Sequence, residues 1–172
     1  MYSRIFEIET APVDEDTRIR ADHYIGDHWF VYNVADYVCA DEDRAGSLDW
    51  LKETLAPASA FIDYFTDDSG NEGFVLREGF QAAYFAAEFP TFQQSLQALF
   101  EAASPETFAS GDLASKMFSL KTAYDDEFGF YVENMESGLS TLNAFLRRAQ
   151  TDTPYYFGGT VDYFGGTVDY HC

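Results

Sequence analysis

The chain has 172 residues, of which 47% are hydrophobic and 18% aromatic, and its 30 acidic and 10 basic residues give a formal net charge of −20. Disordered acidic chains are poor in aromatic residues, so this composition excludes intrinsic disorder and predicts one domain with a core of packed rings. The negative field repels nucleic acids and anionic membranes, which excludes direct binding to either as the function.

The N-terminal third is predicted to form one strand followed by two helices. Apolar and charged residues alternate through residues 3–9, which predicts a strand. From Asp27 onward, apolar residues spaced by four predict a helix that reaches Val38. Ser47 is the expected N-cap of a shorter helix, which Pro57 ends.

The central part is predicted to be mainly helical. Two apolar runs, 61–65 and 73–77, flank an acidic turn and predict a hairpin. Two helices follow, with Pro90 between them, and Ser104 is the expected N-cap of the next segment. Helical spacing of apolar residues predicts two further helices, at 113–124 and 139–146.

These elements predict an α+β fold, a mostly helical single domain with a small antiparallel sheet and a C-terminal Gly-Gly hairpin or meander. We expect residues 1–154 to form an acidic α+β domain. Residues 155–172 would add a C-terminal β segment that packs on the same domain.

The chain ends in a tandem repeat, in which residues 156–162 recur letter for letter as residues 163–169. Each copy contains Gly-Gly between apolar or β-branched runs, a pattern typical of two-residue hairpin turns, which need φ > 0. We therefore expect a three-stranded meander with turns at Gly158-Gly159 and Gly165-Gly166. The repeat would have a structural role, with a partner-binding sheet edge as the alternative.

The length of the repeat argues against a straight strand. Side chains alternate between the two faces of a sheet, so a shift of seven residues would place the second copy on the opposite face. The copies could then not pack equivalently, and one of them would be surplus. In the meander, Asp162 would lie opposite Asp169, which is a mildly repulsive pair.

Residues 67–78 match part of the calcium-binding loop pattern. Asp67, Ser69 and Asn71 supply oxygen ligands at positions 1, 3 and 5, and Glu78 stands at position 12, where the pattern has a bidentate carboxylate. Position 6, which is glycine in the pattern, is Glu72 here. The loop is thus a candidate calcium site, and a solvated hairpin turn is the alternative. We expect no other cofactor.

Negative charge is spread along the whole chain. Residues 1–86 hold 18 acidic and 6 basic residues, a charge of −12, and residues 87–172 hold 12 and 4, a charge of −8. Such a surface suits a basic protein partner, although it could also serve only to maintain solubility. Three acidic runs are the predicted partner-binding residues: Asp14, Glu15 and Asp16; Asp41, Glu42 and Asp43; Asp125, Asp126 and Glu127.

The most specific form of this hypothesis is a mimic of DNA, in which carboxylates at phosphate-like spacing occupy the binding groove of a nucleic-acid-binding protein. In composition the chain resembles small phage and plasmid inhibitors. An enzyme is the less favoured interpretation, because the sequence contains no nucleophile elbow and no phosphate-binding loop. For an enzyme with an unrecognised site, the first candidates are Asp22, His23, Asp27 and His28.

The first residues do not form the basic and apolar segments of a signal peptide. Apolar runs also fall short of the ~18 residues that span a bilayer. We therefore expect a cytoplasmic protein.

Overall fold

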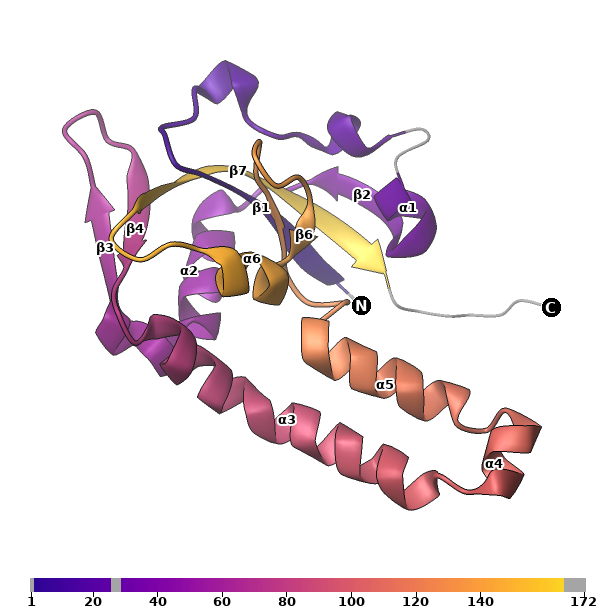
Figure 1. Cartoon of the computed structure of the whole chain (residues 1–172). Coiled ribbons are helices and arrows are strands. Elements are labelled where there is room, and N and C mark those ends of the chain that lie inside the picture. Colours follow the sequence, from indigo (N-terminus) through magenta and orange to yellow (C-terminus); the bar gives the residue numbers. More distant parts are fainter. Residues whose placement is uncertain (1, 26–28, 166–172) are drawn as a thin grey trace.

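A mixed, curled sheet that forms half a barrel organises the molecule (Figure 1). The computed structural model describes residues 2–25 and 29–165. Within them the strand order is β3-β4-β7-β1-β5-β6, and β2 also pairs with β7. Only the β1–β5 pair is parallel among the pairs described. The strands are β1 (Tyr2–Glu9), β2 (Ala35–Ala40), β3 (Ile62–Thr66), β4 (Glu72–Leu76), β5 (Tyr131–Glu133), β6 (Ser140–Thr141) and β7 (Pro154–Gly165).

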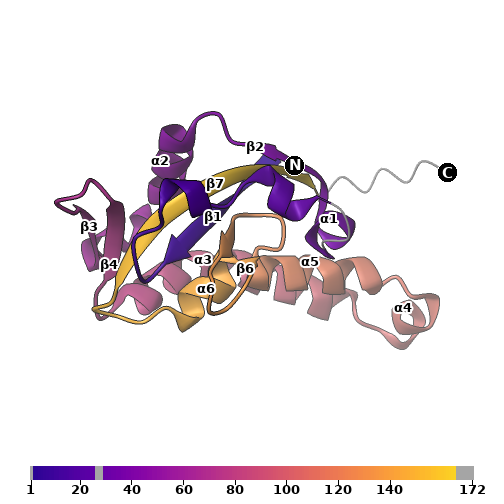
Figure 2. The same cartoon turned by 90° about the horizontal axis from the view of Figure 1, so that it is seen from above.

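Helices cover both faces of the sheet. A larger core joins the sheet to α2, α3 and α6, and a smaller core joins it to η2 and α1. The distal part of α3, together with α4 and α5, extends away from the sheet in both views (Figures 1 and 2). The helical segments are η1 (Glu15–Thr17), η2 (Ala21–Tyr24), α1 (Trp29–Asn33), α2 (Arg44–Thr54), η3 (Ala56–Phe61), α3 (Phe80–Ala102), α4 (Pro105–Ser110), α5 (Ala114–Asp125) and α6 (Leu142–Arg148).

The prediction of a mostly helical domain with a small sheet is wrong. The helix expected to reach Val38 ends at Asn33, and the residues from Ala35 form β2 on the edge of β7. Residues four apart lie on the same face of a strand and also on the same face of a helix. The spacing of the apolar residues therefore did not distinguish a helix from a strand. The C-terminal segment also forms one long strand at the centre of the sheet.

Several local predictions are confirmed. The strand at 3–9, the β3–β4 hairpin and the Ser104 N-cap are present. The helix expected at 139–146 begins only at Leu142, because Ser140–Thr141 form β6, and two further predictions are wrong. Helix α2, however, begins at Arg44, because the Asp43 side chain accepts a hydrogen bond from the Gly46 backbone N–H and caps the helix earlier. Helix α3 continues through Pro90, so one backbone hydrogen bond is lost without ending the helix.

The first Gly-Gly pair does not form the expected hairpin turn. Strand β7 continues through residues 158–159 without a turn and pairs with β1 on both sides of them. Phe6 lies opposite Thr160, whereas Ile8, two residues further along β1, lies opposite Phe157, three residues back along β7. The extra β7 residue makes a β-bulge, a feature that bends a strand and increases its twist.

Glu7 holds the bulge from the β1 side. Its Oε2 accepts hydrogen bonds from the backbone N–H groups of Gly159, at 2.7 Å, and Ile19, at 3.1 Å. A Cβ at Gly158 would lie 2.2 Å from this carboxylate oxygen, and a Cβ at Gly159 would lie 2.6 Å from the Ile19 carbonyl oxygen. The two glycines are therefore required by close approach rather than by a positive φ.

Arg44 holds the bulge from the other edge of β7. Strand β4 pairs with the first three residues of β7 and β2 with the last five, which leaves a gap between them. Arg44 fills this gap, since it donates from Nε to the Gly158 carbonyl at 2.9 Å and from Nη2 to the Phe157 carbonyl at 3.1 Å. Backbone groups that leave the sheet ladder are thus satisfied by side chains.

The bulge also explains how one continuous strand can place both copies of the repeat on the same face of the sheet. Tyr156 lies opposite Glu9 and Tyr163 lies opposite Ser3, so seven residues of β7 match six residues of β1. Because six is even, equivalent residues of the two copies point to the same face of the sheet. The turn expected at Gly165-Gly166 and the Asp162–Asp169 pair involve residues outside the described part of the chain.

We predict that Arg44→Met destabilises the protein by about 1–3 kcal/mol, because the buried carbonyls of Phe157 and Gly158 lose their donors. Urea denaturation measures the change in unfolding free energy. The matched control is Arg77→Met, since Arg77 is exposed and its pairs with Asp63 and Asp152 should contribute about 0–1 kcal/mol. Equal, small effects of the two substitutions would show that the hydrogen bonds of Arg44 to β7 do not stabilise the fold.

Candidate functional site

A pocket of about 280 Å³ gathers three carboxylates on one face of the sheet. Glu7 of β1 and Glu133 of β5 are register partners in the parallel pair, and Glu9 follows Glu7 by two residues and so shares its face. Tyr24 and His23 of η2 line the same pocket, which we call the carboxylate pocket. The Tyr24 hydroxyl donates to Glu133 Oε2 at 3.2 Å.

Burial and the charge of Glu7 together raise the pKa of two carboxyl groups in the pocket, those of Glu133 and Glu9. Desolvation raises the pKa of Glu133, the Tyr24 hydrogen bond opposes this shift, and the charge of Glu7 adds to it. Desolvation likewise raises the pKa of Glu9, although the backbone N–H of Met135 donates to its carboxylate. A cation in the pocket would relieve this repulsion, so the pocket favours positively charged groups.

The carboxylates of the pocket suit an organic cation. Among residues 2–25 and 29–165, no group of three or more His, Cys, Asp or Glu side chains is placed to hold a metal ion. One oxygen of Glu7 is also engaged by the backbone at the bulge. An organic cation, such as the ammonium or guanidinium group of a partner's side chain, fits this chemistry better.

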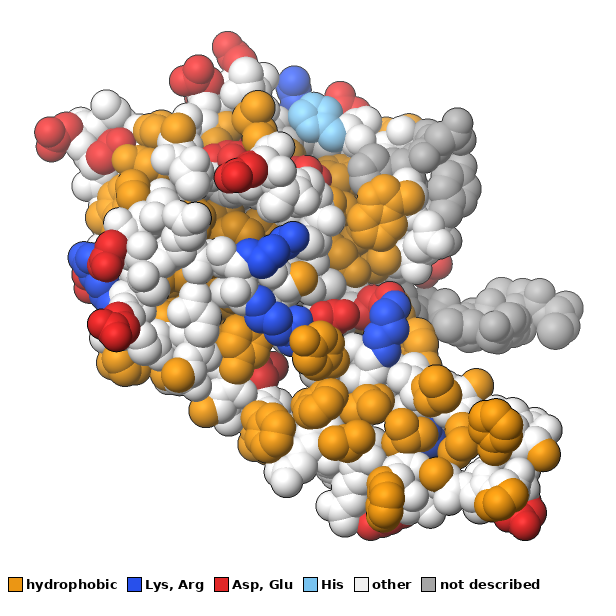
Figure 3. Space-filling view, in the orientation of Figure 1, with side chains coloured by type: hydrophobic (Ala, Val, Ile, Leu, Met, Phe, Trp, Pro, Cys, Tyr) orange, Lys and Arg blue, Asp and Glu red, His pale blue; other side chains and the backbone are white. Residues whose placement is uncertain are grey.

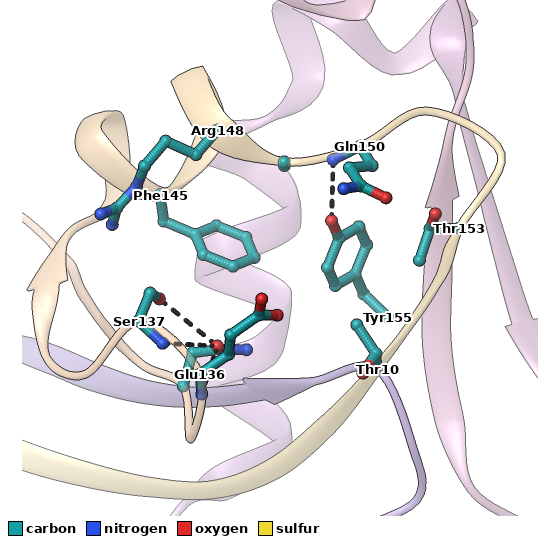
Figure 4. A pocket seen from close by; sticks show the side chains of 10 residues that line it. Thr10, Glu136, Ser137, Phe145, Arg148, Gln150, Thr153 and Tyr155 are labelled. Atoms are coloured by element: carbon teal, nitrogen blue, oxygen red, sulfur yellow. Dashed lines mark hydrogen bonds between the residues drawn. The ribbon is translucent and has the colours of Figure 1, made fainter.

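A second pocket of about 420 Å³ lies beside the end of α6 and combines polar groups with aromatic rings (Figure 4). The rings of Phe145 and Tyr155 line it, and the carboxylate of Glu136 points toward them. The Tyr155 hydroxyl accepts from the Gln150 backbone N–H at 2.8 Å, and Asn134 Oδ1 accepts from neighbouring loop groups. These polar groups stabilise the loops around the pocket and do not define a ligand.

A third, mostly apolar groove of about 270 Å³ lies between α3, α5 and α6. Phe89, Phe92 and Tyr124 form its apolar wall. The guanidinium of Arg147 lies 4.0 Å from the centre of the Tyr124 ring and pairs with Asp125 at 2.9 Å. Because Arg147 is engaged in both contacts, the groove offers mainly apolar and aromatic surface to a ligand.

The structure separates the predicted calcium ligands. Asp67, Ser69 and Asn71 lie at the β3–β4 turn, whereas Glu78 lies beyond the opposite end of β4. At about 3.3 Å per strand residue, Glu78 is roughly 20 Å from the other three residues. Asp67 accepts hydrogen bonds from the Ser69 N–H and from the Asn71 backbone and side chain. The Asn71 side-chain hydrogen bond is the main cause of the lowered pKa of Asp67. Calcium binding at this loop stays a prediction. If calcium binds, it should raise the melting temperature, and a chelator should reverse the increase.

The three predicted partner-binding runs lie in different parts of the structure. Residues 14–16 form an exposed loop at η1, which leads to Ile19 and the rim of the carboxylate pocket. Residues 41–43 precede α2, where Asp41 accepts from Thr160 and Asp43 caps the helix. Residues 125–127 lie at the C-terminal end of α5, where Asp125 pairs with Arg147 and Glu127 pairs with Lys121. The first run is therefore the most available to a partner.

Of the residues named for an enzyme, His23 lines the carboxylate pocket and Asp22 is exposed beside it. Asp27 and His28 lie outside the described residues. The sequence reasoning missed Glu7, Glu9 and Glu133. Their signal was present in part, because acidic residues two apart in a predicted strand must share one face.

Comparisons of the chain with protein families, curated proteins and solved structures gave no match. None of the helices in the described ranges combines the length and the apolar run that crossing a bilayer requires. Function must therefore be inferred from the residues themselves.

We predict that Glu133→Gln makes the protein more stable at neutral pH. A carboxyl group whose folded pKa is raised contributes stability at low pH, and this is lost as the pH rises from its ordinary pKa of 4.5 through the folded value. Glutamine keeps an acceptor for Tyr24 and carries no charge, so the fall in stability with pH should become shallower. Urea denaturation at several pH values between about 4 and 7 measures this slope. If the dependence of stability on pH is unchanged in the variant, the pKa of Glu133 is not raised by folding.

Proposed function

We propose that this chain is a non-enzymatic interaction protein that binds a basic protein partner through its acidic body. The observation that carries the proposal is the excess of carboxylates, since ten basic residues cannot neutralise thirty acidic ones. Six of those cations form eight ion pairs in the described part of the chain. The surplus charge favours cationic surfaces and speeds their association.

The acidic loop 14–16 and the neighbouring carboxylate pocket are the region that we assign to the partner. The loop side chains are exposed, and its backbone is fixed by a hydrogen bond from the Thr17 N–H to the Asp14 carbonyl. The pocket adds carboxylates whose repulsion a cationic side chain would relieve. An arginine or lysine inserted there would form charge-assisted hydrogen bonds.

In its most specific form, the proposal is that the partner is a nucleic-acid-binding protein of the cytoplasm. This chain would then compete with the nucleic acid for the binding site on that partner. Dispersed surface carboxylates support such mimicry. A small enzyme is the second candidate, because the pocket brings His23 and Tyr24 together with two carboxyl groups of raised pKa, a combination used in acid–base catalysis.

A displacement assay tests the proposal. A fluorescent DNA duplex is bound to a purified, sequence-independent basic DNA-binding protein, and the chain is titrated in at low salt. We expect release of the duplex, with an affinity that falls steeply as salt rises because surface charges are screened. Failure to release the duplex at low salt would contradict binding to this class of partner.

Charge reversal locates the interface. The variant Asp14→Lys/Glu15→Lys/Asp16→Lys should weaken binding at least tenfold and reduce the salt dependence, since the reversed groups face the partner. The control reverses the same number of exposed charges at scattered positions: Glu53→Lys, Asp68→Lys and Glu136→Lys. Equal losses in both variants would show that only net charge matters and that the loop is not the interface.

A further inference from the structure

The helical arm, which we define as residues 89–124, carries an exposed apolar surface. Figure 3 shows hydrophobic side chains gathered over one face of this arm. Among the described residues, fourteen large hydrophobic side chains are exposed, and half of them lie on the arm, which is about a fifth of the chain. These seven are Phe89, Leu96, Phe100, Phe108, Met117, Phe118 and Tyr124.

Their spacing makes a continuous stripe along α3. Phe89, Phe92, Leu96 and Phe100 are separated by three or four residues, so they lie on one side of the helix. Phe92 contacts Tyr124 of α5, with ring centres 5.8 Å apart, so the stripe continues onto the second helix of the arm. It also meets the apolar groove, whose wall includes Phe89, Phe92 and Tyr124.

The charge of the arm differs from that of the rest of the chain. Its three acidic residues, Glu101, Glu106 and Asp112, are almost balanced by Lys116 and Lys121, which gives −1. The remaining 136 residues therefore carry −19 of the total of −20. A basic partner gains little from this neutral surface, whereas a second copy of the chain meets almost no repulsion there.

Geometry and area also favour a second copy. The arm extends from the sheet (Figures 1 and 2), so two copies joined at their arms keep their acidic bodies apart. The seven side chains are 46–81% exposed. At roughly 150–250 Å² for each large side chain, their exposed parts offer on the order of 600–1,000 Å², which reaches the ~800 Å² that each partner buries in a standard interface. Paired helical hairpins are a common symmetric packing.

We propose that the helical arm is a self-association surface through which two copies of this chain pair. The interface is isologous, with the α3 stripe of one copy against the arm of the other. It is independent of the acidic loop, so a dimer presents two acidic bodies and two loops to a basic partner. A bivalent partner would then bind with avidity.

Sedimentation velocity over a concentration series tests this with the full chain. We expect a monomer–dimer equilibrium that added salt leaves unchanged or strengthens. At 0.1 M salt, repulsion between charges on the two bodies that lie more than about 10 Å apart is largely screened. Binding of the basic partner should respond to salt in the opposite direction. A wild-type chain that stays monomeric at all concentrations would overturn the proposal, including the case in which its arm binds a different protein.

The variant Phe100→Asp/Phe108→Asp identifies the surface. Both side chains are about 80% exposed, so the fold should keep its stability to urea while the association constant falls at least about tenfold. The control Met135→Asp changes a side chain that is 92% exposed on the body and should leave the dimer intact. A double variant that pairs like wild type, or a control that dissociates equally, would contradict an arm interface.

Discussion

The bulge at Gly158-Gly159 is the constraint on which the fold depends. It lets β7 pair with β1 on both sides of the bulge, from Tyr156 to Phe164, while the other edge of β7 pairs first with β4 and then with β2. Glu7 and Arg44 hold the backbone groups that the bulge releases from the ladder. Glu7 also lines the carboxylate pocket, so the residue that fixes the strand places the first charge of the candidate site.

Charge is distributed unevenly between the two parts of the molecule. The body concentrates carboxylates over a sheet whose cores are apolar and rich in aromatic contacts, and the arm is nearly neutral and apolar. A surface with many like charges resists association with copies of itself, and an apolar surface promotes it. The two proposed binding modes therefore use different forces and different residues, and salt should separate them.

Local signals in the sequence predicted individual elements better than their assembly. The strand at 3–9, the hairpin and the Ser104 cap follow from alternation and turn chemistry, which act over a few residues. The Gly-Gly pair was misassigned because glycine permits a turn and a bulge equally, and only the partner strand decides between them. The carboxylate pocket needed β1 and β5 to be neighbours, although they are more than 120 residues apart in the sequence. Tertiary pairing of this kind leaves no local pattern.

Deletion of Gly159 tests the central claim most directly. Without the extra residue, every side chain after it changes face, so Val161 and Tyr163 would leave the core and the chain would lose its cooperative unfolding transition in urea. Deletion of Gly111, in the exposed connection between α4 and α5, is the control and should leave that transition in place. A Gly159 deletion that unfolds cooperatively with the stability of the wild type would contradict the account.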